Sequence, residues 1–448
     1  MKKVTDMTTG NPAKLLLQFA LPVFLGNIFQ QMFTMVDKII VGQFVGAEAF
    51  SAVGATNALS LLFMSACIGT SMGIGIVVSH YFGAKEEENT AAAIANGTYV
   101  IMAVSLLITI VAELTLEPIL HLLNTPEELM RDAVAYSRIY MGSYVVMSAY
   151  NGPVAVLRAM GDSKTPVKFL ILCSLCNVVL DLIFVVPLHM GVEGAAWATV
   201  ISQAIAAACC IIYSFKNVPQ FRLALKMRKP QKEMMLKTLK VGMPAAFQYA
   251  LMYISTIILQ RVINGFGDSV IGAFTATTQI DSLVLHLYMA LGIAMSTYAG
   301  QNVGAEKPER VAEGVRSIMK INVAASLAFI VLFWTFGKDI MRIFVTEQEI
   351  INIAATGICI NSIFYFGMGL VQLFCNLLTG AGDAAYSFIN GIVEIIARIG
   401  FVIVLTGIPA IGVWGIWFTT GLTWTATGVA AFIRYKGGKW RTKSLAQS

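Results

Sequence analysis

Long apolar stretches, separated by short polar segments, run along the whole chain. About 20 apolar helical residues cross the core of a bilayer, and twelve stretches of this chain reach that length. They lie at 15–43, 51–78, 91–112, 130–160, 166–187 and 191–215, and again at 236–264, 272–299, 312–336, 351–380, 386–407 and 411–434. The pattern predicts twelve transmembrane helices in an all-α polytopic membrane protein.

The second half of the chain repeats the first half about 221 residues later. Gly83 of the segment SxxFGAK is matched by Gly304 of AxxVGAE, and Asp162 of LxAMGD is matched by Asp383 of LxGAGD. A repeat with an even number of helices begins and ends on the same side of the membrane. We therefore expect two parallel six-helix repeats, an N-lobe and a C-lobe, around a central cavity.

The basic residues predict the orientation of the chain. Most of the 31 Lys and Arg residues fall at the two termini, in the segment 216–240 and in every second loop. By the positive-inside rule both termini lie in the cytoplasm. We expect an N-lobe at 1–215, a basic cytoplasmic linker at 216–240, and a C-lobe with a basic cytoplasmic tail at 241–448. The polar start is not followed by a cleavage signal, so we expect the first helix to stay in the inner membrane.

Composition excludes several classes of function. The chain is 57% hydrophobic and only 12% charged, and its net charge of +6 reflects membrane topology, with no pattern typical of nucleic-acid binding. The four histidines are scattered and the seven cysteines lie in apolar stretches, which does not indicate a metal cluster. The glycines at 69–75 lack the Lys-Ser/Thr of a phosphate loop. We expect no cofactor, and transport that runs on an ion gradient.

Polar groups inside the predicted spans carry the strongest functional signal, because a carboxylate in the middle of a membrane is costly. Asp37 lies in the first span, and Asn177 and Asp181 lie one turn apart on the fifth. Asn151 lies in the fourth span and Thr199 in the sixth. These hard oxygen donors suit a proton or a desolvated Na⁺. The alternative is that each side chain caps or bridges a neighbouring helix.

The paired acids are absent from the second copy. At the same offset Asn177 is replaced by Arg398, and Asp181 is replaced by Val402. The second copy instead has Glu394 one turn before Arg398, a spacing typical of an internally compensated ion pair. The sequence therefore favours a cation site in the first copy only.

A second set of residues is a candidate substrate cavity. Asp281 has no partner that the sequence reveals, and would face the central cavity as a site for a cationic substrate. Met and aromatic side chains suit flat hydrophobic cations, and the candidates are Met35, Tyr150, Tyr288 and Met289. Ordinary helix packing is the alternative for each of them.

These features together resemble the multidrug and toxic compound extrusion (MATE) transporters. The resemblance is carried by the first helix with Pro22 and Asp37, by the VGQFVGAEAFSAVG segment after it, and by the FGAK/VGAE and MGD/AGD loops. It covers nearly the whole chain. It implies a two-lobe antiporter that expels cationic, often aromatic compounds in exchange for H⁺ or Na⁺.

Within the family, the acid site resembles the DinF-like branch. The resemblance implies that Pro22 bends the first helix, that Asn151 neighbours the site, and that the H⁺ or Na⁺ ligands are Asp37, Asn177, Asp181 and Thr199. The NorM branch relies on acids in helices 7 and 10, where this chain has Arg261 and only the loop residue Asp383. Neither branch pattern explains Asp281 or Glu394.

Three functions compete at this point. The first is a drug/cation antiporter that acts as a monomer on organic cations. The second is a lipid-linked sugar flippase of the same superfamily, which would normally have two further helices. The third is a membrane enzyme such as a prenyl transferase, but that enzyme needs an acidic Mg²⁺ motif facing water. We favour the antiporter and expect no enzymatic activity.

Overall fold

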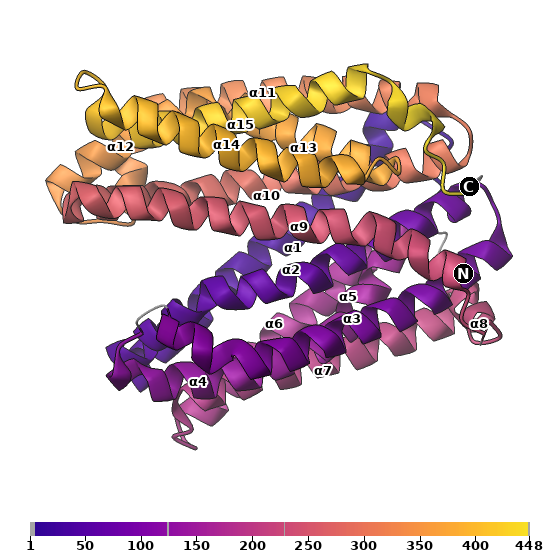
Figure 1. The fold of residues 1–448 in the computed structure, drawn as a ribbon, viewed down its shortest axis with the longest axis horizontal. Helices are drawn as coiled ribbons and strands as arrows, with labels where there is room; N and C mark the ends of the chain where they lie inside the picture. The colour runs from indigo at the N-terminus through magenta and orange to yellow at the C-terminus, as the bar shows by residue number, and fades with distance from the viewer. Residues whose placement is uncertain (1–4, 123–124, 228, 447–448) are drawn as a thin grey trace. The chain divides into compact units, whose positions relative to one another are not determined.

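The computed structural model describes residues 5–122, 125–227 and 229–446, and every regular element in these ranges is helical (Figure 1). The first half contains α1 (Pro12–Ile40), the π-helical turn η1 (Val41–Val45), α2 (Ala47–Gly83), α3 (Glu87–Leu122), α4 (Glu127–Gly142), α5 (Tyr144–Ala159), α6 (Lys164–Val185), α7 (Gly191–Asn217) and α8 (Pro219–Ala224). The second half contains α9 (Lys232–Ile263), η2 (Asn264–Phe266), α10 (Asp268–Gly304), α11 (Pro308–Met341), α12 (Gln348–Ile363), α13 (Tyr365–Gly380), α14 (Ala385–Gly407), η3 (Gly412–Trp414), α15 (Gly415–Lys436) and η4 (Lys439–Thr442).

The length and composition of these helices fit a membrane protein. Ten of the described helical segments are long and apolar enough to span a bilayer, and the bent pair α12 and α13, which meet at 48°, adds an eleventh. The remaining predicted span, 130–160, is formed by α4 and α5, which meet at Ser143. The prediction of an all-α polytopic membrane protein is confirmed.

The duplication is visible in the backbone as well as in the sequence. Residues with positive φ recur 221 positions apart, at Gly46 and Gly267, Lys85 and Glu306, Gly161 and Gly382, and Gly191 and Gly412. The break between α4 and α5 at Ser143 recurs between α12 and α13 at Phe364. Both copies therefore use the same turns at the same places, although their side chains have diverged.

The chain divides into two compact units. The first unit comprises Met1–Met7, Leu21–Ala250 and Leu445–Ser448, and the second comprises Thr8–Ala20 and Leu251–Ser444. Two boundaries lie inside helices, at Ala20 in α1 and at Ala250 in α9, so each of these helices contributes to both units. The division into lobes at 1–215 and 241–448 follows the repeat and stays a prediction.

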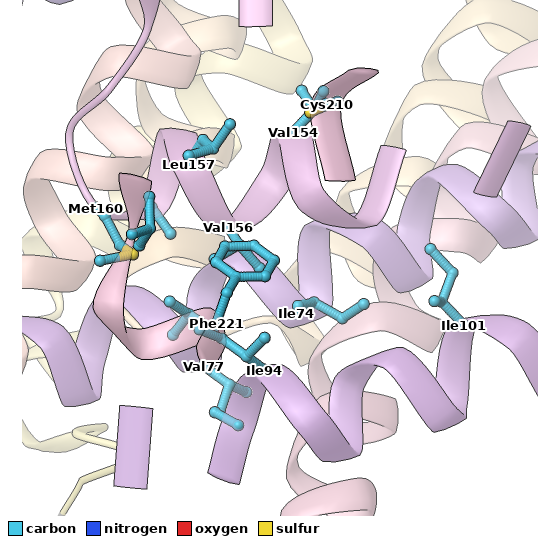
Figure 2. Packing of buried hydrophobic residues seen from close by; sticks show 14 of the residues in the cluster. Ile74, Val77, Ile94, Ile101, Val154, Val156, Leu157, Met160, Cys210 and Phe221 are labelled. Carbon is cyan, nitrogen blue, oxygen red and sulfur yellow. The ribbon is translucent and has the colours of Figure 1, made fainter. Parts of the chain in front are cut away.

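The first unit has a hydrophobic core built mainly from α2, α3 and α5 (Figure 2). Phe221 of the short helix α8 packs into this cluster, and its ring lies 5.7 Å from that of Phe215. The other labelled members are Ile74, Val77, Ile94, Ile101, Val154, Val156, Leu157, Met160 and Cys210. The cluster packs α2, α3 and α5 together with α7 and α8.

Glycines allow α2 to approach α9 closely within the first unit. A Cβ atom on Gly69 would lie 2.5 Å from the backbone nitrogen of Ala246, and one on Gly73 would lie 2.5 Å from the carbonyl oxygen of Thr238. Both distances are too short for any side chain, and the obstructing atoms are backbone. Small residues at membrane helix crossings allow this kind of contact.

In the second unit, buried aromatic rings join α11 to α13. The rings of Phe329 and Phe333 lie 5.8 and 6.0 Å from that of Tyr365. The early segment Thr8–Ala20 is tied to the same unit, because the guanidinium of Arg310 donates to the carbonyl oxygen of Gly10 at 2.9 Å. Tyr365 also donates a hydrogen bond to a second buried acid, Asp281.

Candidate functional site

An acid pair lies inside the first unit, where α1 meets α6. Asp181 is completely buried, whereas Asp37 is half-buried, and the two carboxyl groups interact directly. Around them packs an apolar cluster that includes Ile40, Val41 and Val185. The two aspartates are 144 positions apart in the sequence, and it is the packing of α1 on α6 that brings them together.

Asp181 lacks the partners that normally stabilise a buried carboxylate. Among the described residues, no donor forms a hydrogen bond with either of its oxygens and no basic side chain forms an ion pair with it. Two carboxyl groups in contact cannot both stay ionised in apolar surroundings. The pair is stable when it shares a proton or holds a cation, which is the chemistry expected of a coupling site.

A neutral polar pair lies on the neighbouring helices. The amide of Asn177 donates to the hydroxyl of Thr199 at 3.4 Å, and that hydroxyl donates to the carbonyl oxygen of Ala195 at 3.1 Å. Asn177 lies one turn before Asp181 on α6. The side-chain oxygens of Asn177 and Thr199 are available as further ligands for a proton or for Na⁺. No cluster of three or more His, Cys, Asp or Glu suited to a metal occurs in the part of the chain that the structure describes.

Tyr136 of α4 is a site residue that the sequence did not reveal. Its phenol interacts electrostatically with both Asp37 and Asp181, and its ring packs on the apolar cluster beside them. It is also stacked on Tyr140 one turn later, with ring centroids 5.9 Å apart. A tyrosine in an amphipathic helix carries no distinctive signal, so only the packing of α4 could place it here.

A second buried acid, Asp281, lies inside the second unit on α10. The amide of Asn361 donates to its Oδ2 atom and the hydroxyl of Tyr365 donates to its Oδ1 atom, both at 2.7 Å. Only 8% of Asp281 is exposed. The sequence shows no partner for this residue because both donors lie about 80 positions further along the chain. No basic side chain pairs with Asp281 among the described residues.

Two other acids of the second unit are compensated by arginine. Glu394 accepts from Arg398 at 3.0 Å, and Nε of Arg398 also donates to the hydroxyl of Ser255 at 2.5 Å. Asp383 accepts two bonds from Arg434, at 2.7 and 3.0 Å. Asp181 and Asp281 are therefore chemically distinct from these pairs, since within the described ranges neither forms an ion pair with a cationic side chain.

Comparison with known proteins identifies the family. The family model described as MatE matches residues 22–183 and 244–404, which together form most of the chain. This chain belongs to the MATE family. The assignment to its DinF-like branch stays a prediction.

Relatives of the chain are similar along most or nearly all of their length. The probable multidrug resistance protein YpnP of Bacillus subtilis (strain 168) is 28% identical over 446 residues, which cover 99% of each chain. The multidrug export protein MepA of Staphylococcus aureus (strain bovine RF122 / ET3-1) is 24% identical over 392 residues, covering 85% of each.

Solved structures share the fold. An outward-facing multidrug resistance MATE family transporter of the MOP superfamily has a TM-score of 0.89 at 21% identity, covering 98% of this chain and 99% of that one. A MOP superfamily transporter from Pyrococcus furiosus Vc1 has a TM-score of 0.88 at 20% identity, covering 98% and 100%.

Two other predicted site residues of this MATE family member lie on α5 and in the first half of α1. Asn151 is half-buried in α5, and among the described residues no hydrogen bond joins it to the pair. Pro22 is half-buried inside α1, which continues through it. Asn151 as a neighbour of the cation site and Pro22 as a hinge stay predictions.

The predicted cavity residues differ in how far they are buried. Met35 is 50% exposed and Met289 is half-buried. Tyr150 and Tyr288 are buried, and their hydroxyls bond within their own units, to the carbonyl oxygen of Pro166 at 3.4 Å and to Ser326 at 2.8 Å. The two tyrosines thus have structural partners. Contact of any of these residues with a substrate stays a prediction.

Proposed function

We propose that this protein is a cation-coupled antiporter, which exports hydrophobic, often cationic small molecules by alternating access in exchange for H⁺ or Na⁺. Family membership and the similarity to the multidrug resistance protein YpnP and the multidrug export protein MepA support multidrug export. The observation that carries the coupling is the Asp37–Asp181 pair, in which the fully buried carboxyl group of Asp181 has another acid as its neighbour and, among the described residues, no basic side chain as an ion-pair partner.

The proposed coupling follows from the energetics of that pair. With the cation bound, the pair is neutralised and the helices α1 and α6 can stay packed around it. When the cation leaves, two negative charges in apolar surroundings repel each other, which favours a different arrangement of α1. One elementary charge moving through 100 mV releases about 2.3 kcal/mol, enough to shift a two-state equilibrium roughly 50-fold.

Each site residue has a proposed role in this cycle. Asp37 and Asp181 bind the cation directly. Asn177 and Thr199 supply neutral oxygens, which matter most if the cation is Na⁺, because that ion needs several oxygen ligands. Pro22 lacks the backbone N–H of an ordinary helical residue and weakens the helix where α1 would bend.

Asp281 is proposed as a second position at which a cation acts. The Asp281 carboxylate accepts two hydrogen bonds but has no basic partner among the described residues. A proton, or the positive group of a substrate, would neutralise its charge. By the positive-inside rule, the basic termini and linker support a topology in which both chain ends lie in the cytoplasm, and we propose that the protein lies in the cytoplasmic membrane. We further propose that it acts as a monomer.

Efflux from proteoliposomes tests this function. Purified protein is reconstituted with ethidium, a flat aromatic cation, and a pH gradient and a Na⁺ gradient are imposed separately at zero membrane potential. We expect one of the two gradients to drive ethidium transport without ATP. Transport that needs neither gradient, or no transport of any hydrophobic cation, would contradict the proposal.

A further inference from the structure

A hollow of about 280 Å³ lies in the second unit between the start of α11 and the end of α15. Its floor is the buried ring of Phe374, which packs on Phe432 and Tyr435 at 5.2 and 5.1 Å. Ala312, Val315 and Met319 are the apolar part of its α11 wall. The acid pair, the compensated ion pairs and Asp281 all lie outside it.

Three cationic side chains from three elements line this hollow. They are Arg316 of α11, Lys436 at the end of α15 and Arg441 of η4. All three are exposed, and none of them forms an ion pair or a side-chain hydrogen bond with any described residue. Both guanidinium groups also lie within electrostatic reach of the Tyr435 hydroxyl. Lys436 and Arg441 lie over the rings of Phe432 and Trp440, at 5.5 and 5.6 Å, which leaves their positive charge without an anionic partner among the described residues. Three such cations at one hollow repel each other, so an anion that binds there gains energy from all of them.

The fold brings Arg441 to this place by a specific turn. Gly438 adopts φ of +71°, which reverses the chain after α15. Trp440 is then buried, stacks on Tyr435 at 5.5 Å, and donates its indole N–H to the Tyr435 carbonyl oxygen at 2.9 Å. Because Trp440 is fixed, the next residue is held at the rim of the hollow.

The first copy of the repeat lacks this arrangement. At the same offset, Arg316 corresponds to Ala95 and Lys436 corresponds to Phe215. The ring of Phe215 packs edge-to-face on Phe221 of α8, and α8 lies against α3 and α7, so the equivalent place is filled by apolar side chains. The cationic hollow is therefore a feature of the second copy and not a consequence of the duplicated fold.

We propose that this hollow binds the phosphate of an anionic phospholipid headgroup. The site lies where α11 begins and α15 ends, which is the headgroup level of a membrane-spanning bundle. Basic pockets between transmembrane helices bind such headgroups. The apolar side chains of Val315, Met319 and Phe432 would contact the adjoining acyl chain. A bound lipid would link α11, α15 and η4, and so hold the tail on the second unit.

The test is lipid binding by the delipidated full-length protein, measured by native mass spectrometry during titration with phosphatidylglycerol or phosphatidylcholine. We expect phosphatidylglycerol to be retained preferentially. The variant Arg316→Gln/Lys436→Gln/Arg441→Gln should weaken that retention by roughly 100-fold, since each of the three basic contacts contributes about a factor of five. If the triple variant does not fold, Arg316→Gln alone should show a loss of about fivefold.

A matched control removes the same number of charges from the basic linker. Lys226→Gln/Lys229→Gln/Lys232→Gln should leave phosphatidylglycerol retention unchanged, because these exposed residues lie outside the hollow. Equal losses in both triple variants would overturn the proposal, since general basicity would then explain binding. The proposal would also be overturned if millimolar inorganic phosphate displaced the lipid and phosphate alone stabilised the protein. The hollow would then be a site for free phosphate. Neither result depends on transport, so the proposed function is tested separately.

Discussion

Replacing Glu394 with glutamine removes the negative half of a buried ion pair in α14. The side chains of Glu394 and Arg398 are only 12% and 7% exposed, and their atoms lie 3.0 Å apart. Removing one partner of a buried pair costs about 3–5 kcal/mol, because the other charge is left without compensation. Ser255, which accepts a bond from Arg398, cannot neutralise that charge.

We expect Glu394→Gln to lower the stability of the protein, because Glu394 and Arg398 neutralise each other within α14. In domains of about 150–250 residues, 1 kcal/mol shifts the melting temperature by about 2–4 °C, so Glu394→Gln should lower it by about 6 °C or more. Thermal unfolding of the detergent-solubilised protein at a fixed scan rate measures this shift.

The double variant Glu394→Leu/Arg398→Met is the matched control. Replacing both members of a buried pair by apolar residues is often neutral, so this variant should melt closer to wild type than Glu394→Gln does. The reasoning would be refuted if Glu394→Gln melted within about 1 °C of wild type and nevertheless lost the ion dependence of transport. Glu394 would then belong to the coupling site.

Three further outcomes are expected. Gly69→Ala should lower the melting temperature by several degrees, because its Cβ would meet the Ala246 backbone nitrogen at 2.5 Å. The control Gly400→Ala should not lower it, because a Cβ there meets nothing within 4 Å. Equal effects of the two changes would contradict the close crossing of α2 and α9. Pro22→Ala should fold but lose most gradient-driven efflux, and full transport with full ion dependence would exclude a hinge at this position. Thr346→Cys should react with a membrane-impermeant thiol reagent in intact cells, and labelling only after permeabilisation would reverse the proposed topology.

The sequence predicted the features that depend on local pattern. The apolar stretches marked the helices, and the 221-residue offset predicted a repeat, which the backbone also shows in the positive φ of Lys85 and Glu306. The spacing of Glu394 and Arg398 predicted an ion pair, which the structure confirms at 3.0 Å. These features are set within a few turns of a single helix or by the copying of a segment.

Features that depend on packing between distant helices could not be predicted. Asn361 and Tyr365 reach Asp281 only because α12 and α13 pack on α10. Tyr136 joins the acid pair only because of how α4 packs in the first unit. The sequence also places α1 and α9 wholly in one repeat each, whereas packing divides each helix between two units. Helix periodicity indicates which face is apolar but not which helix will cover it.

The most direct test of the coupling site compares Asp37→Asn and Asp181→Asn with wild type in proteoliposomes that contain ethidium and carry the driving gradient. Asparagine keeps the shape of the protonated acid but cannot release a proton or hold a cation by charge. Both variants should therefore fold and bind ethidium but lose gradient-driven efflux. Normal coupled efflux by Asp37→Asn, together with uncoupled efflux by a well-folded Asp281→Asn, would contradict the assignment and place the coupling site in the second unit.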